Sequence, residues 1–323
     1  MMAIKKYKNS ILRRFPDTMS MFVAMVFLAA SPARAGEPTE QRGFLAPQQA
    51  VAALIAAVKD ANETELLAIL GPDSEDLVSS GDKVADQNGR TRFLQAFEEK
   101  NSLEQAAEGR VLLIVGGRDY PFPIPIVREG NLWRFDTPAG VEEILNRRIG
   151  RNELRTIEAM RAYADAQREF ACRKDTGISE FAQTFVSSEG KKDGLYWDAA
   201  PGDQESPFGP LIARATREGY SNGFDQEDPE PFHGYYFKIL KAQGEHASGG
   251  AFDYVADGRM VLGFALVAYP AKYRVSGVMT FIVNQEGVIY EKDLGEDTVT
   301  EATAMTIFDP DDSWRPHIEP AGR

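Results

Sequence analysis

Residues that commonly build metal and redox sites are scarce in this chain. Its 323 residues include one cysteine, Cys172, and three histidines, His233, His246 and His317. A lone cysteine excludes an intramolecular disulfide and a cysteine-rich metal centre, and the histidines lack the spacing of zinc ligands. We therefore predict no cofactor. We also expect Cys172 to be buried, because free cysteine is among the most buried residue types.

The sequence also lacks a long apolar run. The run at residues 19–30 is shorter than the roughly 20 apolar residues that a membrane-spanning helix needs. It follows a cationic start and precedes Ala33-Arg34-Ala35, an A-x-A cleavage signal, and this order is typical of an export signal peptide. We expect residues 1–35 to be a signal peptide cleaved near Ala35, and the mature protein to be periplasmic or secreted and not an integral membrane protein.

Positive charge is in the minority. The chain has 36 lysines and arginines against 49 aspartates and glutamates, which gives a formal net charge of −13. Most charged residues of the predicted signal peptide are basic, so its removal makes the net charge of the mature chain still more negative. Such a surface repels nucleic acids and anionic lipids, and we predict no nucleic-acid partner.

The hydrophobic periodicity indicates an α+β protein in two parts. The mature length exceeds that of a usual single domain. Residues 36–140 form the first predicted domain, in which helical patterns precede a strand meander. Residues 141–323 form the second, with a long helix over 141–174 and an irregular segment over 175–231. An antiparallel meander follows, with strands expected at 235–240, 260–268, 278–283 and 288–292.

Two local patterns concern helix ends and helix faces. Asn62 is expected to cap a short helix, with Glu65 three residues on as its capping-box partner. The long helix carries basic residues interspersed with acids, so we expect its arginines to be neutralised by intrahelical ion pairs on a solvated face. These arginines are Arg147, Arg148, Arg151, Arg155, Arg161 and Arg168.

The first part ends in a distinctive segment, Gly-Asn-Leu-Trp-Arg-Phe-Asp at residues 130–136. Helices followed by a meander with this ending resemble the nuclear transport factor two-like domains. The resemblance implies a cone-shaped α+β fold whose sheet and helices often enclose a pocket, here lined by residues such as Phe93, Phe97 and Trp133. The alternative is that these aromatic side chains simply fill a small core.

Ordered motifs mark the second part. They are Asp193-Gly194-Leu195-Tyr196-Trp197 and the stretches 205–210, 231–240, 277–283 and 308–311. Through these motifs the chain resembles a bacterial exported family, DUF2950, over almost all of its mature length. The resemblance implies a Gram-negative-type exported protein and brings no activity and no catalytic residues. The long helix and C-terminal hairpins also resemble, more loosely, pilin-like globular domains, although a whole domain separates the N-terminal apolar run from the helix.

Aromatic side chains in the irregular segment lead to our first functional prediction. Exposed aromatics often form interaction hot spots, so we predict a non-catalytic envelope binding or assembly module with an envelope protein as its partner. Its recognition surface would contain Tyr196, Trp197, Phe208, His233 and Tyr235. The alternative role of these residues is to pin a long loop onto the sheet. A different function is a small-molecule carrier or sensor that uses the predicted pocket of the first domain.

Two weaker chemical alternatives remain. Ser206, His233 and an acid such as Asp225 supply the residue types of a hydrolase triad, but Ser206 does not stand in a nucleophile elbow. Two sets of acidic residues could supply the hard oxygen ligands that calcium prefers. One group is Asp225, Glu227, Asp228 and Glu230, and the other is Asp309, Asp311 and Asp312.

Overall fold

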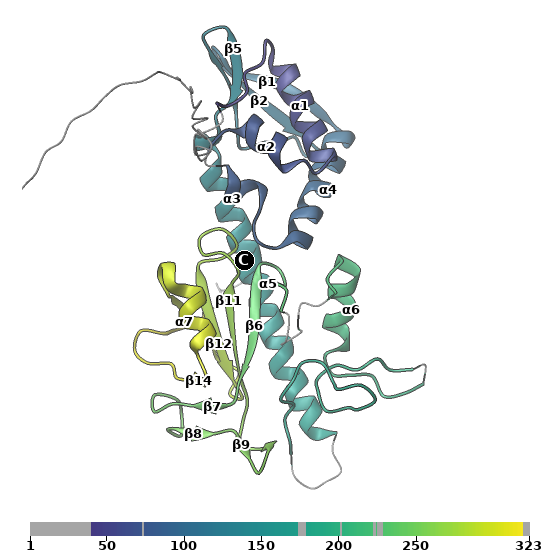
Figure 1. Cartoon of the computed structure of the whole chain (residues 1–323), viewed down its shortest axis with the longest axis vertical. Coiled ribbons are helices and arrows are strands. Elements are labelled where there is room, and N and C mark those ends of the chain that lie inside the picture. The colour runs from purple at the N-terminus through teal and green to yellow at the C-terminus, as the bar shows by residue number, and fades with distance from the viewer. Residues whose placement is uncertain are drawn as a thin grey trace, which may run out of the picture. The chain divides into compact units, whose positions relative to one another are not determined.

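The computed structural model is an α+β protein, as the sequence predicts (Figure 1). It describes residues 40–72, 74–173, 179–200, 202–221, 224 and 229–318. All of these belong to one compact unit. The predicted signal peptide lies outside the described residues.

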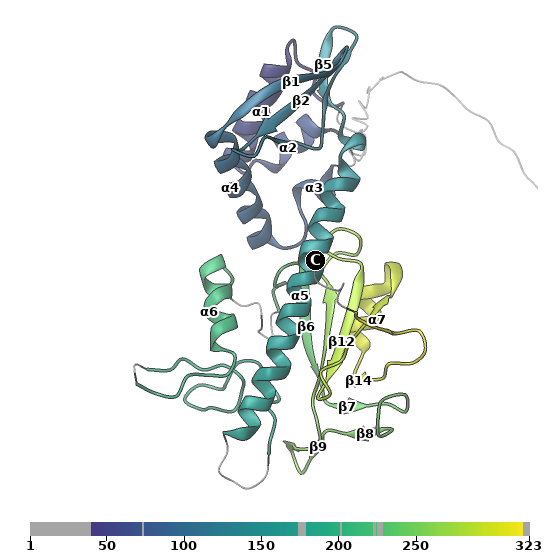
Figure 2. The ribbon, with the colours of Figure 1, turned by 180° about the vertical axis from the view of Figure 1, so that it is seen from behind.

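The N-terminal part of this unit packs helices on one face of a sheet. The helices are α1 (Pro47–Lys59), α2 (Glu63–Leu70), α3 (Glu75–Val78) and α4 (Lys83–Glu99). The sheet is antiparallel, with strand order β1-β2-β4-β5 and β3 paired to β2. Its strands are β1 (Asn101–Ala107), β2 (Arg110–Val115), β3 (Tyr120–Pro121), β4 (Ile126–Glu129) and β5 (Leu132–Phe135). Figure 2 shows α1, α2 and α4 behind the sheet, in agreement with their contacts to β1, β2 and β5.

Side-chain caps explain where two of these helices begin. The Asn62 side chain accepts a hydrogen bond from the Glu65 backbone N–H at 3.1 Å, which confirms the predicted cap of α2. Asp82 caps α4 in the same way, accepting from the Ala85 N–H at 2.8 Å. Each cap satisfies one of the N–H groups that a helix start leaves without an intrahelical partner.

One long helix, α5 (Val141–Cys172), joins the N-terminal part to the C-terminal sheet. It contacts α3 near its start and β11 and β12 farther along. Gly150 does not interrupt it. Its buried face, which includes Ile157, Met160 and Tyr163, packs into the C-terminal core.

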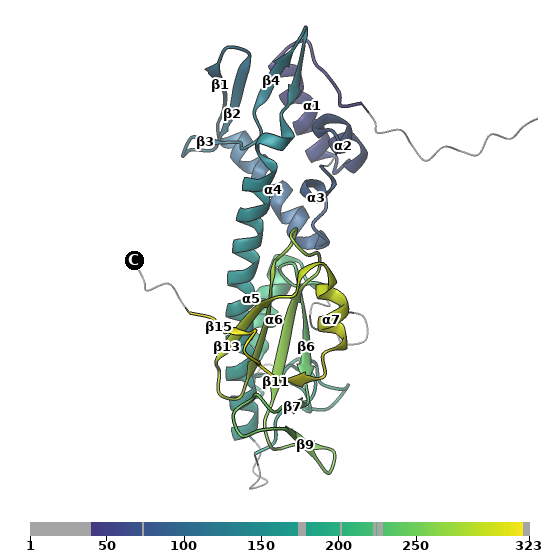
Figure 3. The same cartoon turned by 90° about the vertical axis from the view of Figure 1, so that its left-hand side faces the viewer.

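The predicted C-terminal antiparallel meander is confirmed. The sheet has the order β15-β13-β12-β11-β6, and every pairing in it is antiparallel. Helices α5 and α7 (Thr298–Ala304) lie on opposite faces of it (Figures 1 and 3). The strands of this sheet are β6 (Tyr235–Leu240), β11 (Ala265–Pro270), β12 (Met279–Asn284), β13 (Ile289–Asp293) and β15 (Arg315–Pro316).

Smaller strands and two 3-10 turns complete the unit. A three-stranded sheet has the order β14-β7-β8, and β9 pairs with β10. These strands are β7 (Ala242–Gln243), β8 (Phe252–Asp253), β9 (Val255–Ala256), β10 (Arg259–Met260) and β14 (Ile307–Phe308), and the turns are η1 (Thr137–Ala139) and η2 (Gly295–Asp297).

The unit contains two separate clusters of buried apolar residues. One runs from Ala50 to Phe135 and the other from Ile157 to Trp314. The predicted domain boundary after residue 140 falls between them, at the start of α5.

The segment predicted to be irregular contains a helix, α6 (Gly209–Glu218), which ends where Gly219 takes a left-handed conformation with φ 99°. Its apolar anchors Leu195, Phe208 and Leu211 are buried in the C-terminal core, so this segment is packed onto the sheet domain.

One expectation about burial is wrong. Cys172 is exposed, because it is the last residue of α5 and the buried face of the helix ends at Ala171.

Candidate functional site

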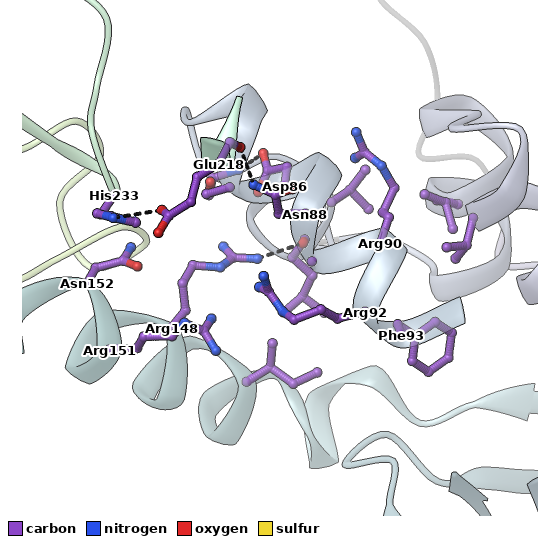
Figure 4. A pocket seen from close by; sticks show the side chains of 18 of the residues that line it. Asp86, Asn88, Arg90, Arg92, Phe93, Arg148, Arg151, Asn152, Glu218 and His233 are labelled. Carbon is purple, nitrogen blue, oxygen red and sulfur yellow. Dashed lines mark hydrogen bonds and ion pairs between the residues drawn. The ribbon is translucent and has the colours of Figure 1, made fainter. Parts of the chain in front are cut away.

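A pocket of about 750 Å³ opens beside the first half of α5 (Figure 4). Residues from α1, α2, α4 and α5 line it, together with the end of α6 and the turn that precedes β6. Its lining therefore combines residues that lie as far apart in the sequence as Leu54 and His233. Its size is within the usual range of about 300–1,000 Å³ for small-molecule sites.

One side of the pocket is apolar. We call this set the apolar wall, and it is built by inward-facing side chains of the N-terminal core. Its members are Leu54, Val58, Leu66, Leu70, Phe93, Phe122, Ile124 and Ile144. Phe93 and Phe122 touch each other, with ring centroids 5.4 Å apart, and both are only partly buried, so their rings offer apolar surface to a ligand.

The other side of the pocket is cationic. Two carboxylates, Asp86 and Glu218, line the pocket against six arginines, which are Arg90, Arg92, Arg148, Arg151, Arg155 and Arg217. The excess is opposite in sign to the net charge of −13 of the whole chain. A cleft lined by one sign of charge concentrates ligands of the other sign.

Three of these arginines form what we call the arginine cluster: Arg92 from α4, and Arg148 and Arg151 from α5. Arg148 is fixed by backbone carbonyls, since its Nη1 donates to Asp76 O at 2.6 Å and its Nη2 to Leu77 O at 2.8 Å. Figure 4 shows Arg92 and Arg148 reaching from their two helices into the same space, while Arg90 points away from them.

Arg92 and Arg151 have no countercharge among the residues that the structure describes. Among the described residues, no carboxylate lies within ion-pair distance of either guanidinium, and neither makes a side-chain hydrogen bond. Desolvation by the surrounding protein lowers the pKa of Arg151, and the nearby charges of Arg92 and Arg155 lower it further. Arg151 is an exposed residue that lines the pocket, so its side chain combines solvent contact with partial desolvation.

His233, at the far end of the pocket, is affected by the same positive charges. Desolvation by burial, followed by the charges of Arg155, Arg214, Arg151 and Arg92, lowers the pKa of His233 to about 4. The imidazole is therefore neutral at pH 7. Its Nε2 lies 3.1 Å from Glu218 Oε2 but has no hydrogen bond of acceptable geometry in the described structure.

A buried carboxylate holds this end of the pocket in place. Asp82 Oδ2 accepts hydrogen bonds from Tyr220 Oη at 2.9 Å and from the Gly234 N–H at 2.8 Å. His233 N–H in turn donates to Tyr220 Oη at 3.2 Å. Burial raises the pKa of Asp82, although these hydrogen bonds oppose the shift. The start of α4 and the turn before β6 are thus joined through one side chain.

The three aromatics predicted to line a pocket have different positions. Phe93 belongs to the apolar wall, whereas Phe97 and Trp133 are not part of the pocket lining. Both pack, partly buried, against the N-terminal core. Trp133 lies beside Phe44, with which it exchanges two backbone hydrogen bonds.

The five residues predicted as a recognition surface are also spread over different environments. Phe208 and Tyr235 are buried in the C-terminal core, with relative exposures of 1% and 0%, and Trp197 is 8% exposed. His233 lines the pocket. Tyr196 is partly buried, and its hydroxyl donates to Asp198.

The weaker chemical candidates are placed as follows. No hydrogen bond joins Ser206 to His233 in the described structure, and Asp225, Glu227 and Asp228 lie outside the described residues. Asp309 accepts from His246 N–H at 2.8 Å, and Asp311 accepts from Ser313 N–H at 2.9 Å. Within the described ranges, no three His, Cys, Asp or Glu residues are grouped so as to hold a metal ion.

Sequence reasoning missed the arginine cluster. The predicted intrahelical ion pairs exist for Arg147 with Glu143, Arg155 with Glu158 and Arg168 with Asp165. The described part of the chain shows no such pair for Arg148 or Arg151. The available signal was spacing, because no acid stands three or four residues from Arg148 or Arg151 in the sequence. Glu143, Glu158 and Asp165 do stand at that spacing from Arg147, Arg155 and Arg168.

Comparison with known proteins identifies one family. A family model described as protein of unknown function (DUF2950) matches residues 41–317. No curated protein and no solved structure matches the chain. Across the described residues, no helix is both long and apolar enough to cross a membrane.

Proposed function

The chain belongs to the DUF2950 family, whose description names no activity, and we propose a function from the pocket: non-catalytic binding of a small molecule, as a carrier or sensor. One observation carries this proposal. The pocket joins an apolar wall to guanidinium groups that have no countercharge among the described residues. Folding alone does not require such an arrangement, because unpaired charges near an apolar surface cost free energy.

The polar groups of the lining support binding more than catalysis. The Tyr220 hydroxyl donates a hydrogen bond to Asp82, and burial together with this carboxylate raises the pKa of its phenol. His233 is neutral and faces Glu218. A nucleophile with an adjacent, oriented base is what covalent catalysis needs, and the described lining residues do not provide one.

The proposed place of action is the periplasm or the exterior, and this rests on the sequence of residues 1–35. A second candidate function is the envelope binding or assembly module. One surface feature favours it: Val186 is 48% exposed and forms a parallel bridge with the partly exposed Tyr196. Together they offer a small amphipathic patch to a protein partner.

Two glycines provide a matched test of the pocket. Gly89 lines the pocket on α4, and Gly150 lies on α5 outside the lining. A Cβ at either position would meet nothing within 4 Å. Both sit inside helices, where replacing glycine removes its helix penalty, so Gly89→Trp and Gly150→Trp should both fold.

The probe is N-phenyl-1-naphthylamine, a neutral apolar dye whose fluorescence rises in apolar sites. We expect the mature protein and Gly150→Trp to bind it with similar affinity. Gly89→Trp should lose at least about tenfold, because an indole occupies the space of the dye. Equal binding by the two variants, or no binding by the unmodified protein, would refute the proposed function.

A further inference from the structure

We propose, resting on the function proposed above, that the ligand is an amphipathic anion. Its carboxylate or phosphate head would sit on the arginine cluster, and its apolar chain would lie along the apolar wall. The fold brings these two surfaces together from separate elements, since the wall comes mainly from α1, α2 and the segment before β4, and the cluster from α4 and α5.

The charge of the head follows from the lack of a carboxylate partner for Arg92 and Arg151 among the described residues. Like-charged guanidinium groups repel one another, and the repulsion grows where protein excludes water. Asp86 offsets part of the charge of Arg148, but its Oδ2 accepts the Ser80 N–H at 2.9 Å. An anion bound between Arg92 and Arg151 would supply the missing countercharge.

Nearby carboxylates that could have neutralised the cluster are engaged elsewhere. Glu158 lies within 3.8 Å of Arg155 and 3.7 Å of Arg214. Glu153 accepts the N–H groups of residues 278 and 279, each at 3.0 Å. Glu218 faces His233. None of these three carboxylates pairs with Arg92, Arg148 or Arg151 in the described structure.

The planar forks of the arginines fit carboxylate and phosphate heads. Guanidinium groups bind both through paired N–H donors. Arg148 already donates to two carbonyls, which holds its charge at a fixed point. Arg92 and Arg151 make no side-chain hydrogen bond in the described structure, and their donors are available to a ligand.

The apolar wall argues against a small hydrophilic anion as the ligand. Inorganic phosphate or acetate would leave Phe93, Phe122 and Ile144 in contact with water. An aliphatic chain would cover them, and each methylene removed from water strengthens binding by about fourfold. Two sources share this chemistry, a free fatty acid or alkyl phosphate and the head of a membrane phospholipid.

The test compares ligands that differ only in the head. Isothermal titration of the mature protein would use dodecanoate, dodecyl phosphate, dodecan-1-ol and acetate below micelle-forming concentrations, with phosphatidylglycerol vesicles as a separate arm. We expect dodecanoate or dodecyl phosphate to bind at least about tenfold more tightly than dodecan-1-ol, since hydrogen bonds to charged groups contribute that much or more. Acetate should bind far more weakly than dodecanoate. Uptake from vesicles alone would assign the phospholipid source.

Arginine variants then test where the charged head of the ligand binds. Arg92→Gln and Arg151→Gln should each weaken dodecanoate by about tenfold and leave dodecan-1-ol unchanged. Arg147→Gln is the matched control, because Arg147 lies on the same helix, pairs with Glu143 and does not line the pocket. Its binding should match that of the unmodified protein.

The outcomes separate the two proposals. Equal affinity for dodecanoate and dodecan-1-ol, with no effect of Arg92→Gln and Arg151→Gln, would overturn the anion inference while the neutral-dye result keeps the small-molecule function. A loss in Arg147→Gln equal to that in the other two would also overturn it. Failure of both the dye and the dodecyl ligands would refute the binding function itself.

Discussion

Replacement of Asp82 by alanine should destabilise the protein well beyond the loss of a helix cap. Asp82 is 1% exposed and caps α4 through the Ala85 N–H. It also accepts from the Gly234 N–H and from Tyr220 Oη. Asp82→Ala would leave these two donors without their acceptor, so the turn that forms the far end of the pocket would lose its attachment to α4.

The magnitude follows from the bonds lost. A helix cap contributes about 1 kcal/mol, and a hydrogen bond to a charged acceptor about 1.5–3 kcal/mol. Burial raises the pKa of Asp82 above its unfolded value. Stability linked to this carboxyl is therefore complete below the unfolded pKa and falls as pH rises through the folded pKa. This pH-linked loss of stability already applies at pH 7. We therefore expect Asp82→Ala to lower the free energy of unfolding there by a net amount of about 3–5 kcal/mol.

Asn62→Ala is the matched control. Asn62 caps α2, whose buried residues belong to the N-terminal apolar cluster. Among the described residues, its side chain makes this capping hydrogen bond and no tertiary one. Urea unfolding followed by circular dichroism should show a loss of about 1 kcal/mol for this variant, and hydrogen exchange at the Gly234 amide should quicken only in Asp82→Ala. A loss for Asp82→Ala within about 1 kcal/mol of the control would refute the role given to its tertiary hydrogen bonds.

Three further predictions concern the turn before β6 and the thiol. Gly234→Ala should lower the free energy of unfolding in urea by at least about 2 kcal/mol more than Gly250→Ala does. Both glycines have positive φ, but only at Gly234 would a Cβ meet Asn152 Nδ2 at 2.6 Å. Equal losses for the two variants would contradict this reasoning. Because the pKa of His233 is lowered to about 4, its contribution to stability is present above its unfolded pKa of about 6.5 and is lost as pH falls toward 4. The melting temperature of His233→Asn should therefore fall less between pH 7 and pH 5 than that of the unmodified protein, and parallel curves would argue against the shift. Exposed Cys172 should react fully with an aromatic disulfide reagent without denaturant, whereas labelling only in urea would show that the thiol is covered.

Local patterns were sufficient for much of the fold. The cap at Asn62 and the alternation that produces β12 and β13 depend on neighbours within a few residues, and both are present as predicted. The edge strand β1 has little signal in the sequence, because its residues are mostly exposed and show little apolar alternation. Helix α6 was missed because it buries few residues, Leu211 and Ala215 among them.

The candidate site depends on tertiary structure that a single sequence does not reveal. Arg147 and Arg148 are neighbours in the sequence, yet Arg147 pairs with Glu143 while Arg148 turns to the carbonyls of residues 76 and 77. Which of the two faces a pocket depends on where α4 and the segment after α2 pack. Burial of Phe208 and Tyr235 likewise follows from how the irregular segment folds onto the sheet.

The central claim is that the pocket holds a small molecule in the protein's own environment. The most direct test is native mass spectrometry of the mature protein, isolated without organic solvent from the envelope of its own host, alongside Gly89→Trp and Gly150→Trp. We predict one discrete bound mass on the unmodified protein and on Gly150→Trp that is missing from Gly89→Trp. The same bound mass on all three proteins, or no bound mass on any of them, would contradict the account.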